Sequence, residues 1–178
     1  PIWNDYCAPV KIPGLKRFHD APMALSDIPI VDVVLLSHNH YDHLDAATVM
    51  HLHRLHPHIL WVIPSKLTPW FKKRGITRVV ELSWWQVHND PAFQITAVPA
   101  QHYSGRTLWD QNKTHWNGYV FESKASGKRF YFTGDTGYNP IGFKEIGQEW
   151  PYMDLSLIPI GTYIPIDFMS PVHCSPYD

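Results

Sequence analysis

The chain has 178 residues, of which 44% are hydrophobic, and a formal net charge of −1. This length and composition predict one domain with a sizeable core. The nearly neutral charge lacks the basic footprint of nucleic-acid-binding proteins, so no nucleic acid partner is expected. The longest apolar stretches fall far short of the roughly 18 residues that span a bilayer, and no signal peptide is visible. We therefore expect a protein that is cytoplasmic or peripheral at a membrane.

The first half of the chain alternates between strand and helix patterns. After an irregular, proline-rich lead-in over residues 1–29, the apolar and β-branched run 30–36 predicts a buried strand. Asp45 is the expected N-cap of a helix that ends near Leu55, and a second strand follows at 59–63. A second helix is expected to begin at a Ser65 cap, to run through Lys73 or Arg74 and to be closed by Gly75 at the C′ position.

The second half predicts mostly strands. The expected strands cover 78–82, 93–98, 119–122, 129–133 and 155–160, with one short helix at 143–148. The segment Ser126-Gly127-Lys128 indicates a hairpin between two of them. Strands that alternate with helices and then form a hairpin are typical of an α/β fold with a mixed sheet.

The segment SHNHYDHLD follows the first predicted strand directly and holds four ligand-type residues, His38, His40, Asp42 and His43. On an extended loop, His38 and His40 point the same way and can reach one cation, whereas Asp42 and His43 fall on the next turn and suit a second. Imidazole and carboxylate ligands favour Zn²⁺, although Fe, Mn or Ni would also bind them. The alternative is a solvated histidine-rich loop, since the chain has twelve histidines.

Two further ligand candidates also follow predicted strands. His102 comes after the strand that ends near Pro99, and Asp135 lies in the turn Thr133-Gly134-Asp135-Thr136-Gly137. An α/β scaffold builds its sites from loops at one sheet edge, so we expect both side chains to join the first cluster. The glycines around Asp135 permit a tight turn that aims its carboxylate across the strand ends.

Three segments carry a resemblance to a known family, namely SHNHYDHLD, AQHYSGRTLWDQNKTHWNGY and FTGDTGYNP. Together they resemble the metallo-β-lactamase superfamily, and within it the N-acylphosphatidylethanolamine-hydrolysing phospholipase D group and its bacterial relatives. The resemblance implies an αβ/βα sandwich with two zinc ions between its sheets. Carried over residue by residue, it implies that His38, His40 and His102 hold one zinc. Asp42 and His43 would hold the second, with Asp135 bridging.

The resemblance also implies a reaction. Two zinc ions would lower the pKa of a water molecule between them, and the resulting hydroxide would attack a phosphodiester. Asp42 would orient this nucleophile, and His173 would contact the phosphate or protonate the leaving oxygen. The expected protein is therefore a zinc-dependent phosphodiesterase of phospholipase D type acting on N-acylphosphatidylethanolamine-like phospholipids. For His173, a surface position near a chain end is the alternative.

The chain departs from the family pattern at both ends. The family's second zinc also takes a histidine from a late strand, which this sequence does not supply after His173, and the opening strands are absent before Pro1. Residues 1–178 are therefore expected to be a single, partial metallo-β-lactamase-like domain, truncated at both ends. The alternatives are another hydrolase of the superfamily, acting on a lactone, thioester or nucleic acid phosphodiester, or an inactive truncated metal-binding protein.

Tryptophans and the remaining histidines are less specific. The chain has eight tryptophans, and Trp84, Trp85, Trp109 and Trp116 favour either core packing or an apolar groove for lipid at a membrane interface. Peripheral contact with a membrane is thus one expectation. A further set of histidines along and beyond the first helix is expected to form a solvated face: His51, His53, His56 and His58.

Overall fold

Two β-sheets pack face to face in the computed structural model, which describes residues 2–12 and 14–178. The smaller sheet contains β1 (Val33–Leu35), β2 (Leu60–Pro64) and β3 (Val79–Leu82), all parallel. The larger sheet has the order β4 (Val87–Asn89), β5 (Phe93–Val98), β6 (Gly118–Ser123), β7 (Arg129–Phe132), β8 (Leu155–Leu157).

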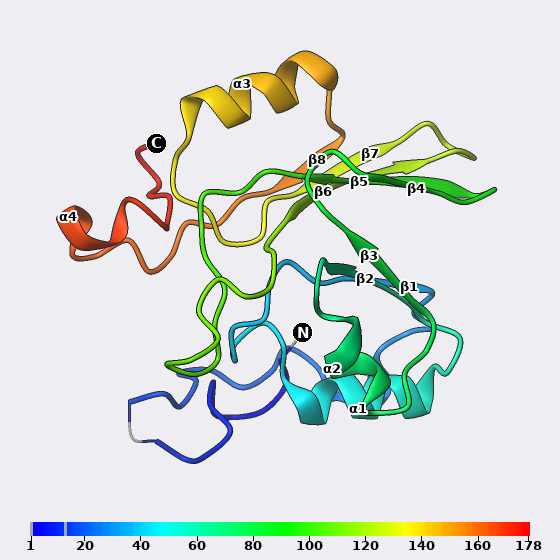
Figure 1. Cartoon of the computed structure of the whole chain (residues 1–178), viewed down its shortest axis with the longest axis vertical. Coiled ribbons are helices and arrows are strands. Elements are labelled where there is room, and N and C mark those ends of the chain that lie inside the picture. Colours follow the sequence, from blue (N-terminus) through cyan, green and yellow to red (C-terminus); the bar gives the residue numbers. More distant parts are fainter. Residues whose placement is uncertain (1, 13) are drawn as a thin grey trace.

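Helices cover the outer faces of both sheets. Helices α1 (Ala46–Leu55) and α2 (Thr68–Lys72) lie beside the smaller sheet, and α3 (Pro140–Glu149) crosses the larger one (Figure 1). Two short elements, η1 (Leu25–Asp27) and α4 (Ile166–Met169), lie outside these layers. The predicted αβ/βα sandwich is therefore confirmed. None of the helices within the described residues is long and apolar enough to cross a membrane.

Alternation of side chains along the strands builds the three core layers. In β2, Trp61 and Ile63 pack toward the helices, whereas Leu60 and Val62 pack toward the larger sheet. Successive strand residues point to opposite faces, so one fully buried strand serves both layers. The third layer lies between the larger sheet and α3 and contains Val98, Val120, Tyr131, Ile146 and Trp150.

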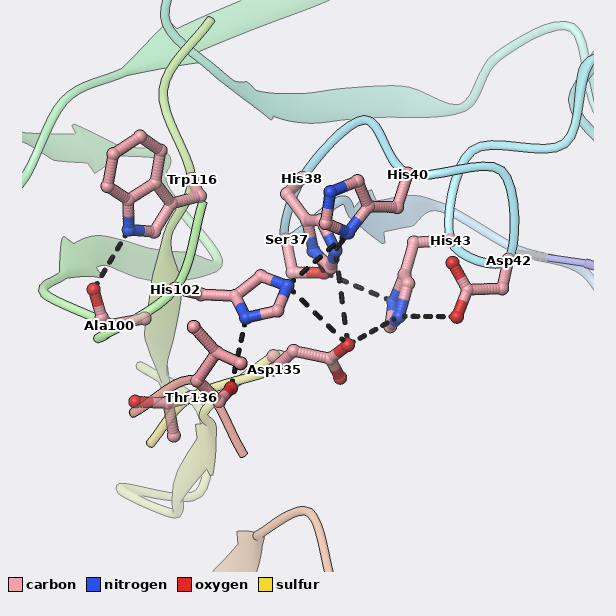
Figure 2. Close-up of polar contacts among 12 residues, drawn as sticks. Ser37, His38, His40, Asp42, His43, Ala100, His102, Trp116, Asp135 and Thr136 are labelled. Atoms are coloured by element: carbon pink, nitrogen blue, oxygen red, sulfur yellow. Dashed lines mark hydrogen bonds and ion pairs between the residues drawn. The ribbon is translucent and has the colours of Figure 1, made fainter. Parts of the chain in front are cut away.

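Strand direction gathers the loops that matter for function. β6 is antiparallel to both β5 and β7, so β5 and β7 run the same way and their following loops leave at one sheet edge. These loops carry His102 and Asp135, and the loop after β1 reaches them across the sandwich (Figure 2). Tyr119 in β6 fixes this approach, because its buried hydroxyl donates to the Leu36 carbonyl at 2.8 Å.

Local caps explain where the helices agree with the sequence prediction and where they differ. Asp45 caps α1 as predicted, accepting from Thr48 N at 2.8 Å. The predicted Ser65 cap of α2 is wrong: Ser65 pairs with Ser83 Oγ, and Glu81 from β3 accepts from Thr68 N. Gly75 has φ +78° and ends this segment as predicted.

Three boundaries also differ from the prediction, and one strand is additional. The first strand begins at Val33 rather than Ile30, which is 75% exposed and unpaired in the ladder, and the last ends at Leu157 rather than Ile160. Helix α3 starts at Pro140 because Asn139 Oδ1 accepts from two backbone N–H groups of its first turn. Strand β4 was not predicted, since its three residues show no clear alternation.

Candidate metal centre

The loop after β1 brings three imidazoles together over six residues. Backbone N–H groups of His43 and Leu44 both donate to the His40 carbonyl, so the chain curls into a turn directly after His40. This turn brings the ring of His43 within 4.1 Å of the ring of His38, measured between centroids. His38 is almost fully buried, and the group opens toward the strand ends of the larger sheet (Figure 2).

His102 from the loop after β5 completes a first group of nitrogens. His40 Nδ1 lies 2.8 Å from His38 Nε2 and 3.3 Å from His102 Nε2. Nitrogens around a tetrahedral zinc, each about 2.0–2.1 Å from the ion, lie about 3.3 Å apart. The three imidazoles therefore match the spacing of ligands around one small cation.

Asp135 faces this nitrogen group and His43 with a single oxygen. Its Oδ2 atom lies 3.0 Å from His43 Nε2, 3.8 Å from His102 Nε2 and 4.0 Å from His38 Nε2. The ligand atoms of His38, His43 and Asp135 form a second group within 4.8 Å of one another. Imidazole nitrogens with one shared carboxylate fit a site for Zn²⁺ or a similar divalent ion.

Two other predicted residues lie at the margin of the cluster. Asp42 contacts only His43 among the cluster residues described here, at 3.5 Å, and its side chain is 52% exposed. His173 forms a third close group with His102 and Asp135, and its ring centroid is 5.2 Å from that of His102. His173 is half-buried and lines the cavity beside the cluster, which differs from the alternative of a surface residue.

Hydrogen bonds behind the imidazoles fix their orientation. The Nδ1 atom of His38 lies 3.0 Å from Ser37 Oγ, and that of His102 lies 3.0 Å from the Val172 carbonyl, to which it donates. With Nδ1 engaged, Nε2 of each ring is free to face the cluster. Sequence reasoning missed both partners. Ser37 had a signal in its position next to His38, whereas Val172 is 70 residues from His102.

The turn that carries Asp135 requires its glycine. Gly134 has φ +62°, and a Cβ there would lie 2.5 Å from the Cβ of Ser37. The close approach lets the Asp135 turn reach the loop after β1, as predicted from the residues around it. Gly137 is equally constrained, because a Cβ would lie 2.6 Å from the Pro171 carbonyl oxygen.

Electrostatics divide the cluster into neutral and charged members. Burial lowers the pKa of His38 well below its ordinary value and that of His102 to about 4, so both rings are neutral, the form that binds metal. Burial also lowers the pKa of His43, but Asp135 and Asp42 outweigh it and raise it to about 9. Burial raises the pKa of Asp42, yet the bond from His43 brings it to about 2.

A cavity of about 870 Å³ lies directly over the cluster. Its polar wall includes Asp42, His173 and Arg106, and Arg106 is the one Lys or Arg in this lining within the described part of the chain. Two apolar residues on the wall are strongly exposed, Leu108 at 92% and Ile160 at 64%. The cavity therefore combines a ligand cluster, one cation and an apolar edge.

The tryptophans and remaining histidines are divided between core and surface. Trp84 and Trp116 line a second cavity of about 260 Å³, and Trp116 donates to the Ala100 carbonyl (Figure 2). Trp109, in contrast, is 82% exposed. The predicted solvated face is wrong for three of its histidines, because His51, His53 and His56 are half-buried.

Comparison with models of protein families identifies the superfamily of the chain. The model of the family described as "Beta-lactamase superfamily domain" matches residues 3–178. The chain therefore belongs to the β-lactamase superfamily, as the three sequence segments predicted.

Two curated relatives narrow the resemblance. "N-acyl-phosphatidylethanolamine-hydrolyzing phospholipase D 1" of Caenorhabditis elegans is 40% identical, over 99% of this chain and 51% of the relative. The mitochondrial "N-acyl-phosphatidylethanolamine-hydrolyzing phospholipase D" of Saccharomyces cerevisiae is 32% identical, over 100% of this chain and 38% of the relative. The chain thus spans about half, or less, of the length of these relatives.

Solved structures agree on the fold. An isothiocyanate hydrolase from Delia radicum gut bacteria matches with a TM-score of 0.62 at 19% identity, over 89% of this chain and 62% of that one. The E377D mutant of the CmlA β-hydroxylase matches with a TM-score of 0.60 at 18% identity, over 92% of this chain and 32% of that one. At these identities the likeness concerns the fold alone.

Proposed function

We propose that this chain carries the centre of a metal-dependent hydrolase, a zinc phosphodiesterase of phospholipase D type. The observation that carries the proposal is the position of Asp135 Oδ2 beneath the 870 Å³ cavity. This oxygen faces both His38, a member of the first nitrogen group, and His43. A carboxylate oxygen that faces the first nitrogen group on one side and His43 on the other suits a ligand shared by two metal ions. The names of the worm and yeast relatives support N-acylphosphatidylethanolamine-like phospholipids as substrates.

The donor set assigns the metals to residues. His38, His40 and His102 would hold one zinc, His43 and Asp42 the second, and Asp135 would bind both. His43, protonated in the metal-free protein, would release its proton on binding metal. When bound, such metals lower the pKa of a water molecule and neutralise charge on phosphoryl oxygens. His173 lies close enough to His102 and Asp135 to adjoin the same centre.

The chain's own side chains would orient the reactants. Asp42 remains ionised at neutral pH because its pKa is about 2, so it accepts a hydrogen bond from the attacking water and directs it toward phosphorus. A P–O bond forms to the water oxygen, the P–O bond to the N-acylethanolamine breaks, and the proton that the water loses is released to solvent. His173, on the cavity wall, donates a proton to the leaving oxygen. The products are phosphatidic acid and N-acylethanolamine.

The cavity wall suits a substrate that is both anionic and apolar. Arg106 supplies a positive charge near the cluster, and Leu108 and Ile160 supply apolar surface at the edge. The neighbouring Trp109 is also exposed, so we propose that Leu108 and Trp109 contact the lipid surface from which the substrate enters. Headgroup and glycerol would then occupy the cavity while the acyl chains stay near the bilayer.

Product analysis tests the proposal directly. The purified protein is loaded with zinc and incubated with N-acylphosphatidylethanolamine in mixed micelles, and N-acylethanolamine is measured by mass spectrometry. We expect product with the parent protein, and a loss of at least 100-fold with His38→Ala, because His38 contributes to two of the close ligand groups.

Matched controls decide between the candidate activities. His58→Ala removes an exposed histidine outside the cluster and should leave turnover unchanged. Turnover of a lactone, a thioester or a nucleic acid phosphodiester without release of N-acylethanolamine would contradict the proposed substrate while keeping the metal-dependent hydrolase. Bound zinc with no turnover of any of these substrates would favour an inactive metal-binding protein.

A further inference from the structure

One arginine closes the segment that carries three of the candidate ligands, His40, Asp42 and His43. The Nη1 atom of Arg106 donates to the carbonyl oxygen of Asn39 at 2.9 Å and to that of Leu44 at 2.6 Å. These two carbonyls stand immediately before and after the segment His40–His43. The distance across the segment is therefore held by a single donor group.

A second contact joins the same arginine to the middle of the segment His40–His43. The guanidinium carbon of Arg106 lies 3.9 Å from the centroid of the Tyr41 ring. Gly105 N, one residue earlier, donates to Asn39 Oδ1 at 2.7 Å. The loop after β5, which also carries His102, is thus joined to the loop after β1 at three residues, Asn39, Tyr41 and Leu44.

The backbone around Arg106 is itself held rigidly. Asp110 Oδ1 accepts from the backbone N–H groups of Arg106 at 2.8 Å and Thr107 at 2.7 Å, and from Thr107 Oγ1 at 3.0 Å. Ser104 Oγ donates to the Thr114 carbonyl at 2.6 Å across the base of the loop. Arg106 therefore extends from a stiff turn, and its two carbonyl bonds restrict the segment His40–His43.

We propose that Arg106 is a positioning residue that sets the placement of His40 and His43 relative to His102 and thereby determines metal affinity. The inference rests on the proposed metal centre. A lysine would not replace it fully, because its compact ammonium cannot donate to both carbonyls and also place a second part of the cation over the Tyr41 ring, as the guanidinium does. One guanidinium nitrogen donates to the two backbone carbonyls that flank the ligand segment, so Arg106 affects metal affinity through the ligand residues.

The test compares Arg106→Lys with Arg74→Lys. Arg74 is the control, since its guanidinium also lies over an aromatic ring, 3.7 Å from the Trp70 centroid, and donates to one carbonyl. The Trp70 ring also lies 5.9 Å from Arg106, but within the described residues Arg74 makes no hydrogen bond to the ligand segment. Zinc affinity is measured by competition with a chromophoric chelator, and the visible spectrum of the Co²⁺-substituted protein reports ligand geometry. We expect Arg106→Lys to bind metal about 10-fold or more weakly and to change the spectrum, and Arg74→Lys to do neither.

Each outcome has one meaning. If the parent protein binds no zinc, the proposed metal centre fails and the inference falls with it. If the parent binds zinc and Arg106→Lys matches it in affinity and spectrum, only the positioning role is overturned.

Tyr41→Leu, which removes the stacking ring but keeps both carbonyl bonds, provides a milder variant in case Arg106→Lys does not fold. It should weaken zinc binding in the same direction, and unchanged affinity would contradict the role of the stack.

Discussion

At the scale of single residues, Gly134 shows how backbone conformation controls the candidate centre. Replacement by alanine would place a side chain at φ +62°, with its Cβ 2.5 Å from Ser37 Cβ. We expect Gly134→Ala to lower the free energy of unfolding by about 2–5 kcal/mol, the sum of left-handed strain and overpacking. It should also weaken metal binding, because Asp135 and the Ser37–His38 pair would move apart. Chemical denaturation and zinc competition measure the two effects.

Gly127 offers the matched control for this substitution. Its φ is +68°, but a Cβ there would meet no atom within 4 Å. Gly127→Ala should therefore lose only about 1–2 kcal/mol from strain and should bind zinc normally. Equal losses in the two variants would show that the contact with Ser37 does not matter.

The pair His43 and Asp42 predicts how the stability of the metal-free protein depends on pH. The pKa of His43 is raised from 6.5 to about 9, so its contribution is fully present below pH 6.5 and is lost as pH rises through 9. The pKa of Asp42 is lowered from 3.8 to about 2, so its contribution is present above pH 3.8 and is lost as pH falls through 2. Urea unfolding of the chelator-treated protein between pH 6 and 10 should show decreasing stability.

His43→Gln isolates the histidine part of this dependence. Glutamine keeps a side-chain amide near Asp135 but does not titrate, so the decrease between pH 6.5 and 9 should become smaller. An unchanged slope would assign the alkaline loss of stability to other groups.

At the scale of elements, the loop between β5 and β6 presents its apolar tip to solvent. Leu108 is 92% and Trp109 82% exposed, whereas the base of the loop is bonded to the ligand segment. We expect Leu108→Ser/Trp109→Ser to reduce binding to phosphatidylcholine vesicles about tenfold, because both side chains would lose burial in the interface. Vesicle flotation measures the bound fraction, and neutral lipid excludes simple charge attraction.

An exposed apolar residue elsewhere provides the comparison. Ile141 is 70% exposed at the start of α3, which covers the outer face of the larger sheet (Figure 1). Ile141→Ser should leave vesicle binding unchanged. If Ile141→Ser reduces vesicle binding as much as the double variant does, general surface hydrophobicity rather than this loop is responsible.

The sequence predicted the elements whose signals are local. Asp45, the alternating strand at 93–98 and the ligand-rich segment after β1 all express short-range patterns, and the structure places each of them close to expectation. The predicted cap of α2 was wrong because the observed acceptor, Glu81, belongs to β3, which follows the helix in the chain. Burial of the histidines on α1 was missed because it depends on packing against other segments rather than on periodicity.

The same distinction between short-range patterns and contacts between distant segments applies to the candidate metal centre. Five candidate ligands were predicted from their residue types and their positions at strand ends, namely His38, His40, His43, His102 and Asp135. The contacts that orient them join distant segments, such as His102 with the Val172 carbonyl and Arg106 with Leu44. No pattern within either segment reveals its partner, so these contacts required the structure.

At the scale of the whole molecule, metal binding should stabilise the fold. The candidate ligands come from loops of both sheets, and the native state alone brings them together. We expect zinc at 100 times its dissociation constant to add about 2.7 kcal/mol to the free energy of unfolding. Thermal melts with zinc and with a chelator measure the shift, which His38→Ala should abolish. An equal shift in that variant would indicate binding outside the cluster.

The order of the two sheets along the chain has a consequence for engineering. The smaller sheet ends at Leu82 and the larger begins at Val87, so each is one continuous piece of polypeptide, and the ligand cluster draws from both. A chain severed between these strands would yield two fragments that each hold only part of the donor set. Zinc bound at the cluster would then hold the two fragments together, and the metal concentration would control whether they assemble.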